Sequence, residues 1–255
     1  MKKEKLDETV TMTEKLGANQ KIGIMFCAMV SAVATGYVPG YINLYYTDTV
    51  GISMGAVAMI HMITKITDGV TDIIMGMIVD RTNTRLGKAR PWVLAGGIGI
   101  GVSIMLLFSC PASLSTGAKV AFCAGMYFLA NPFFGTMASV SCGTLNNLLT
   151  ADSKKRGVLG VFSAYGTLVP VVIIGLVVPK ILSAMHESQA AYTTATLIFA
   201  VMSIVASIIG VACVRETVTE RSKEQLVEKQ PVKETLHELL HNKYFIFLAL
   251  GTILY

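Results

Sequence analysis

The stretch AAYTTATLIFAVMSIVASIIGVACV, residues 190–214, contains no Asp, Glu, Lys or Arg. A charge-free apolar stretch of this length exceeds the ~20 residues that an α-helix needs to cross the hydrocarbon core of a bilayer. Four further stretches upstream share this property: Ile22–Thr47, Trp92–Ala118, Val120–Ala151 and Gly157–Pro179. Repeated segments of this kind predict an all-α, multi-pass membrane protein.

The composition of the whole chain supports the same class. Of its 255 residues, 53% are hydrophobic and only 15% are charged, whereas roughly 25% of the residues in soluble domains are charged. The N-terminus stays polar as far as Lys21 and does not resemble a secretory signal peptide. The 5 cysteines form no C-x-x-C pair, so we expect neither a disulfide framework nor a zinc site.

A sixth span is predicted over residues 49–79, although three charged side chains interrupt it. A shorter apolar run closes the sequence at residues 244–255, and we interpret it as the start of a seventh helix in a fragment of a larger protein. The predicted organisation is a cytoplasmic N-terminal segment (1–21), a six-helix transmembrane half (22–214), a cytoplasmic central loop (215–243) and a truncated seventh helix (244–255).

The basic residues indicate the orientation. They gather before the first span, between the second and third, between the fourth and fifth, and after the sixth, whereas the opposite side carries only Lys119 and Lys180. Because cytoplasmic loops carry the excess of Lys and Arg, we expect the N-terminus and the central loop in the cytoplasm. The predicted location is therefore the cell (inner) membrane.

The second span carries the chemistry. Lys65, Asp68 and Asp72 lie in a predicted membrane helix, where ionisable side chains are costly and are functional candidates by default. The two carboxylates are one helical turn apart on one face, with Thr71 beside them, and Asp68 falls near the bilayer midplane. Such oxygen donors suit Na⁺, while the same pair could instead share a proton. A self-neutralising Lys65–Asp68 ion pair is the structural alternative, and it leaves Asp72 unexplained.

The sequence GMIVDRTNTRLGKARPW follows at residues 76–92. Its spacing GxxxDRxxxR resembles the loop between helices 2 and 3 of the major facilitator superfamily. With the continuation GKxRPW, the segment YYTD at residues 45–48 and the aspartate pair of the second span, it resembles the glycoside–pentoside–hexuronide cation symporters, the melibiose permease-like family. The resemblance spans the first five helices.

The resemblance implies a twelve-helix transporter built of two six-helix halves, with a sugar site between the halves. It implies that Asp68 and Asp72 bind the coupling cation, Na⁺ or H⁺, and that Thr71 stands where the family has another oxygen donor. No other cofactor is expected. It also implies a cytoplasmic gate formed by charged loop residues, here Asp80, Arg81, Arg85, Lys88 and Arg90.

The sequence departs from this family at three positions. The charged sugar contacts of the family align with Ala32, Ala130 and Ser163, so a galactoside substrate is in doubt, whereas another glycoside or a different small solute remains open. Replacement contacts could come from hydrogen-bonding and aromatic side chains, and the candidates are Lys65, Tyr37, Asn43, Asn131 and Phe134. Helix packing or a helix cap explains Asn43, Asn131 and Phe134 equally well, and Asn131-Pro132 is also a candidate kink.

The function predicted is therefore cation-coupled symport of a sugar, glycoside or related solute by alternating access. The expected partners are the solute, the ion and the lipid bilayer, with no nucleic acid. The alternative is a membrane binding or regulatory protein, or an incomplete half-transporter, of the same fold. We expect no enzyme, because no catalytic constellation is present. His61 and His186 are predicted to be isolated and solvent-facing.

Overall fold

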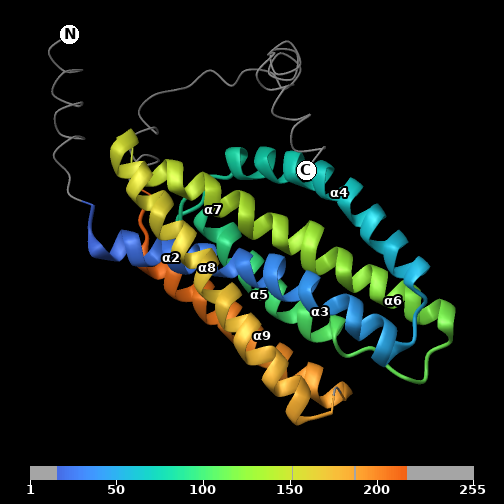
Figure 1. Ribbon diagram of the computed structural model, residues 1–255. Coiled ribbons are helices and arrows are strands. Elements are labelled where there is room, and N and C mark those ends of the chain that lie inside the picture. Colours follow the sequence, from blue (N-terminus) through green and yellow to red (C-terminus); the bar gives the residue numbers. More distant parts are fainter. Residues whose placement is uncertain (1–15, 151, 187, 217–255) are drawn as a thin grey trace, which may run out of the picture. The chain divides into compact units, whose positions relative to one another are not determined.

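The computed structural model describes residues 16–150, 152–186 and 188–216, and the regular elements within them are helical (Figure 1). The predictions for the central loop from residue 217 onward, for the truncated seventh helix and for residues 1–15 lie outside the described residues. In chain order the elements are α2 (Ala18–Ala32), η1 (Val33–Tyr37), α3 (Val38–Leu44), η2 (Tyr45–Val50), α4 (Met54–Arg81), α5 (Arg90–Leu107), α6 (Thr116–Phe128), η3 (Leu129–Gly135), α7 (Thr136–Leu149), α8 (Ser153–Ala184) and α9 (Gln189–Cys213), where η marks a π-helical segment.

The predicted membrane spans correspond to these helices. In the described part of the chain, five helical spans are long and apolar enough to cross a bilayer: Ala18–Val50, Arg90–Leu107, Thr116–Leu149, Ser153–Ala184 and Gln189–Cys213. The sixth predicted span is α4, an uninterrupted helix of 28 residues, or about 42 Å at 1.5 Å per residue. Its length suits a membrane span, and its charged side chains set it apart from the other five.

One predicted boundary is wrong. The charge-free stretch Trp92–Ala118 is not one helix, because α5 ends at Leu107 and α6 begins at Thr116. The intervening residues 108–115, which include Pro111, carry no charge, so the absence of charge did not reveal the loop. Its end is marked instead by Ser115, the residue that precedes the first turn of α6.

Two of the spans contain π-helical segments. The first span includes η1 and η2, and the fourth is interrupted by η3 with Pro132 buried inside it. Proline has no N–H to donate and its ring crowds the preceding turn, so the backbone widens there. The predicted kink at Asn131-Pro132 is thus a local widening within a continuous helical span.

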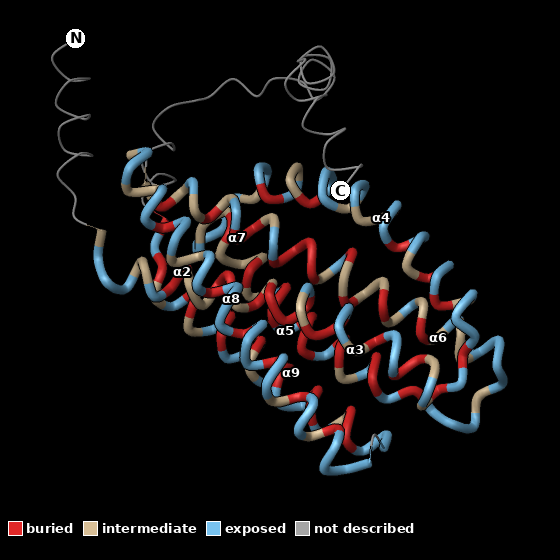
Figure 2. The backbone as a smooth tube through the Cα atoms, viewed as in Figure 1, coloured by how far each residue is buried: buried red, intermediate tan, exposed pale blue. Residues whose placement is uncertain are grey.

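The helices pack closely where small residues face one another. α2 runs against α8 and α9, and α5 lies against α9 and α7, while α4 lies at the edge of the bundle against α7 and η3. Gly166 of α8 is buried against the backbone of Met25, and Gly96 of α5 meets the backbone of Ala138. Much of α4 is exposed on the side away from these contacts (Figure 2).

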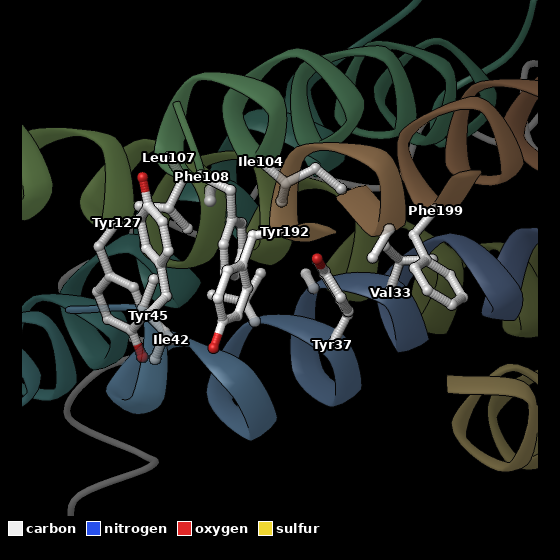
Figure 3. Close-up of a cluster of buried hydrophobic side chains, with 14 of the residues drawn as sticks. Val33, Tyr37, Ile42, Tyr45, Ile104, Leu107, Phe108, Tyr127, Tyr192 and Phe199 are labelled. Atoms are coloured by element: carbon white, nitrogen blue, oxygen red, sulfur yellow. The ribbon is translucent and has the colours of Figure 1, made fainter. Parts of the chain in front are cut away.

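An aromatic cluster fills the core between the first, third and sixth spans (Figure 3). The Tyr37 ring packs against Phe108 and Phe199 with centroids 5.1 and 4.9 Å apart, and its hydroxyl bonds to Thr196 at 2.7 Å. The Tyr45 ring also contacts Phe108, with centroids 5.0 Å apart and the ring planes tilted by 47°. Tyr37 is fully buried, so this arrangement makes it a core residue rather than the solute contact predicted above.

At the opposite end of the bundle, a carboxylate binds the N-terminus of α5. Glu216 is buried, and its oxygens accept the backbone N–H groups of Lys88, Ala89 and Arg90 at 2.7, 2.9 and 3.0 Å. These are donors that a helix start leaves unpaired, in a field that favours negative charge. Gly87, with φ +114°, leaves the space that the carboxylate occupies. The Arg90 guanidinium also donates to the Val211 carbonyl, at 2.7 Å from its nearer nitrogen.

We expect Gly166→Ala to destabilise the bundle and Gly175→Ala, on the same helix, to leave it intact. A Cβ at Gly166 would collide with the Met25 backbone, whereas a Cβ at Gly175 meets nothing within 4 Å. Overpacking of this kind costs about 1–3 kcal/mol, and Gly→Ala at an open helical site gains up to about 1 kcal/mol. The melting temperatures of the purified variants in detergent measure both effects. Equal melting temperatures would show that α2 and α8 are not packed this closely.

Candidate functional site

A polar stripe runs along one face of α4. His61, Lys65, Asp68 and Asp72 are spaced i, i+4, i+7 and i+11, a spacing that keeps side chains on one side of an α-helix. The stripe borders α6, η3 and α7, which are the elements that α4 packs against. Asp68 is half-buried, whereas Lys65 and Asp72 are exposed.

The two carboxylates meet a single hydroxyl from α7. Thr136 is buried, and its Oγ1 donates to Oδ1 of Asp68 at 3.2 Å. The Asp72 carboxyl interacts with the same hydroxyl. The negative charge of Asp68 repels it, and the positive charge of Lys65 attracts it. One hydroxyl can donate only one proton, so it cannot satisfy both carboxylates. Two carboxylates and a hydroxyl thus converge without full compensation of their charge.

The ion-pair alternative is not what the structure shows. Among the described residues, the ion pair within 4.0 Å joins Lys155 to Asp152, at 3.9 Å. Lys65 makes no such pair with Asp68 or Asp72, although it lies one helical turn before Asp68 on the same stripe. The carboxylates are therefore left with the hydroxyl of Thr136 as their hydrogen-bonding partner from a neighbouring helix.

The predicted third ligand, Thr71, occupies a different position. Its hydroxyl is half-buried and donates to the backbone oxygen of Asp68 at 2.9 Å, within its own helix. The side chain that bridges from outside α4 is Thr136, which sequence reasoning missed. A group of three His, Cys, Asp or Glu side chains that could hold a metal ion is not present in the described residues.

His61 extends the stripe toward the N-terminal end of α4, and the expectation that it is isolated is wrong. Its Nε2 lies 2.8 Å from Oδ1 of Asn43 on α3, and its Nδ1 lies 3.0 Å from the hydroxyl of Tyr127 on α6. The Tyr127 ring meets the imidazole edge-on, with centroids 5.0 Å apart. Asn131 in turn interacts with the Tyr127 hydroxyl. His186, by contrast, is exposed as predicted.

The predicted solute residues therefore divide into two groups. Asn43, Asn131 and Lys65 lie along this stripe, where they are exposed or half-buried. Phe134 instead fills the space left by Gly99 on α5 and meets Phe133 edge-on at 4.9 Å, so it packs two helices together. Tyr37 belongs to the buried core.

The predicted gate residues also divide. Asp80, Arg81 and Arg85 are exposed at the end of α4 and in the loop that follows it. Lys88 and Arg90 are held by their backbone N–H groups to Glu216, and Arg90 additionally by its side chain. The loop is thus anchored at its α5 end, and its exposed charges lie at the α4 end.

Comparison with known proteins places the chain among transporters. A family described as MFS/sugar transport protein matches residues 22–255. The putative glycoside/cation symporter YagG of Escherichia coli is 33% identical over 150 residues, covering 59% of this chain and 31% of that protein. The inner membrane symporter YicJ of the same organism is 32% identical over 144 residues, covering 56% and 31%.

The isoprimeverose transporter of Lactiplantibacillus pentosus is 27% identical over 220 residues, covering 84% of this chain and 45% of that protein. The chain thus spans about a third to a half of the length of these relatives. The match confirms the family resemblance drawn from the aspartate pair and the loop motif. It also confirms the predicted all-α, multi-pass membrane fold, and the prediction that the chain is not an enzyme, because the family consists of sugar transporters. Because the family model covers nearly all of the sequence, the chain belongs to the MFS/sugar transport protein family.

Proposed function

We propose that the protein carrying this chain is a secondary transporter that couples Na⁺ or H⁺ to the uptake of a sugar, glycoside or related small solute. The observation that carries the proposal is the convergence of Asp68 and Asp72 on the Thr136 hydroxyl. The names of the relatives, which include a glycoside/cation symporter and an isoprimeverose transporter, support the same class.

The cation site consists of the two carboxylates and the Thr136 hydroxyl, whereas the Thr71 hydroxyl is engaged by the backbone of its own helix. Two unit charges one helical turn apart repel each other strongly in a medium of low dielectric, and Lys65 can offset only one of them. A bound Na⁺ gains oxygen ligands in place of water, and a bound proton removes one charge directly. Either ion brings the site close to neutrality.

Neutrality at this site connects the ion to the conformational change. Alternating access requires the membrane helices to pass through a state closed to both sides, and an uncompensated charge would be costly to bury in that state. Protein that holds the solute can therefore change conformation with the ion bound and not without it. Asp80, Arg81, Arg85, Lys88 and Arg90 form the gate on the cytoplasmic side, in an inner membrane protein with a cytoplasmic N-terminus.

We expect Asp72→Asn to uncouple transport from the ion. The substitution removes the excess charge permanently, so the conformational change no longer needs the cation. In proteoliposomes the variant should exchange labelled solute between the two sides and fail to concentrate it under a Na⁺ or H⁺ gradient. Asn147→Leu, at an exposed position of α7, serves as the control and should accumulate solute like the wild type. Accumulation that survives in both Asp68→Asn and Asp72→Asn would exclude this pair as the coupling site.

We expect Thr136→Val to weaken cation binding while the protein remains folded. Valine keeps the shape of threonine and removes the hydroxyl oxygen that would coordinate Na⁺ beside the two carboxylates. The cation dissociation constant should rise about tenfold or more, measured by isothermal titration calorimetry. Thr167→Val, whose hydroxyl is exposed on α8 and bonds within its own helix, is the matched control. An unchanged dissociation constant would remove Thr136 from the site.

The orientation is tested by labelling two single cysteines. Asn83, after α4, and Ser113, after α5, are both exposed in loops at opposite ends of the bundle. In a Cys213→Ser background, a membrane-impermeant maleimide should label Ser113→Cys in intact cells and Asn83→Cys only after the cells are opened. The four remaining cysteines, Cys27, Cys110, Cys123 and Cys142, are buried. Labelling of Asn83→Cys in intact cells would invert the proposed topology.

A further inference from the structure

The cluster of Asn43, His61 and Tyr127 is not used by the cation site. We propose that it is a neutral hydrogen-bonding subsite that takes a hydroxyl of the transported solute, two helical turns along α4 from Asp68. The inference rests on the proposed function, because it identifies part of the solute site of that transporter. It adds His61 and Tyr127 to the predicted solute residues, although the sequence suggested neither. It also identifies the side-chain NH₂ of Asn43 as the group that donates to the solute.

The hydrogen bonds of the cluster fit a neutral imidazole. Oδ1 of Asn43 is an acceptor, so Nε2 of His61 carries the proton and donates to it at 2.8 Å. Nδ1 then accepts from the Tyr127 hydroxyl at 3.0 Å, and the Tyr127 oxygen interacts with Asn131. Each ring nitrogen is thereby satisfied. No charge is needed to hold the cluster together.

This chain of bonds leaves one polar group available. The oxygen of the Asn43 amide is occupied by His61, and Asn43 is exposed. Among the described residues its NH₂ group has no hydrogen-bond acceptor, so two donors remain for a solute. Tyr127 is buried and His61 is half-buried, so they act as positioning residues for the Asn43 amide.

The chemistry of the cluster favours an uncharged or acidic oxygen compound over a cation. A cation would need oxygen ligands, and the Oδ1 of Asn43 is already engaged. Lys65, one turn along the same face and exposed, adds an ammonium group that repels cations and donates to oxygen lone pairs. An amide and an ammonium on one face suit vicinal hydroxyls of a sugar ring, which accept and donate hydrogen bonds at short spacing.

The position of the cluster also compensates for the lost family contacts. Ala32 and Ala130 are fully buried and offer a solute no hydrogen bond. Asn43 and Lys65 supply donors on the surface that α4 shares with α3 and α6. A solute bound there would lie two helical turns from Asp68 on the same helix face, so α4 would contact both the solute and the ion.

The test combines protein variants with sugar analogues. The probes are the methyl glycosides of xylose, glucose and galactose and their monodeoxy derivatives, with binding to the intact protein measured by equilibrium dialysis. For the glycoside that binds the wild type best, Asn43→Leu and His61→Leu should each raise the dissociation constant about tenfold, as expected for a lost hydrogen bond at a polar site. One monodeoxy derivative should bind wild type and both variants equally. Asn147→Leu is the matched control.

Three results would overturn the inference. In the first, the variants bind every analogue as tightly as the wild type does. In the second, the variants bind all analogues more weakly by the same factor and have a lower melting temperature, as expected if the cluster only links helices. In the third, they change cation affinity and leave sugar affinity unchanged. Failure of the wild type to accumulate solute under either ion gradient would instead refute the proposed function. Accumulation by wild type with unaffected variants refutes the subsite alone.

Discussion

The repulsion between two carboxylates one turn apart on a membrane helix is the constraint on which the site depends. Such a pair is too costly to face lipid, so α4 must direct it toward other helices, and the face it presents to α7 and η3 holds Asp68 and Asp72. The Thr136 hydroxyl relieves part of the cost and leaves the remainder uncompensated. That remainder is what a coupling ion would remove.

The π-helical segment η3 brings the partners of this helix onto one surface. Tyr127 and Thr136 are nine residues apart, which in a regular α-helix is two and a half turns and places them on opposite faces. Both nevertheless contact α4, Tyr127 through His61 and Thr136 through Asp68. The residues between them form η3 around Pro132, where each turn holds more residues and the rotation per residue falls. The widened segment therefore rotates Tyr127 and Thr136 toward the same neighbour.

Sequence reasoning identified the helices and the aspartates because both signals are local. Charge-free runs longer than a bilayer is thick mark membrane helices, and a charged residue within such a run is conspicuous by itself. The charge-free loop after Leu107 was missed for the same reason. Thr136, Tyr127 and Glu216 were missed because their roles depend on tertiary contacts. Regular α-helical periodicity predicts that Tyr127 and Thr136 point in opposite directions. In the sequence Glu216 is one more charge in a polar segment, and its role follows only from its hydrogen bonds to the backbone of residues 88–90. Tyr37 was assigned to the solute because an aromatic hydroxyl suits a sugar, whereas Phe108 and Phe199 enclose it.

The two ends of α4 are held differently, and this difference bears on how the helix could respond to a solute. At its C-terminal end, Trp92 donates to Thr82 at 2.8 Å, and the loop beyond Gly87 is fixed to the start of α5 by Glu216. Toward its N-terminal end, the buried Val57 and Ile60 pack into the core, and the hydrogen bonds across helices join neutral side chains, His61 with Asn43 and Tyr127. A hydrogen bond between neutral side chains contributes about 1 kcal/mol and is readily replaced by a hydrogen bond to a solute. The three hydrogen bonds from backbone N–H groups to a buried carboxylate are stronger and are not readily replaced. The hydrogen bonds at the His61 end can therefore be replaced by bonds to a solute more easily than those that fix the loop to α5.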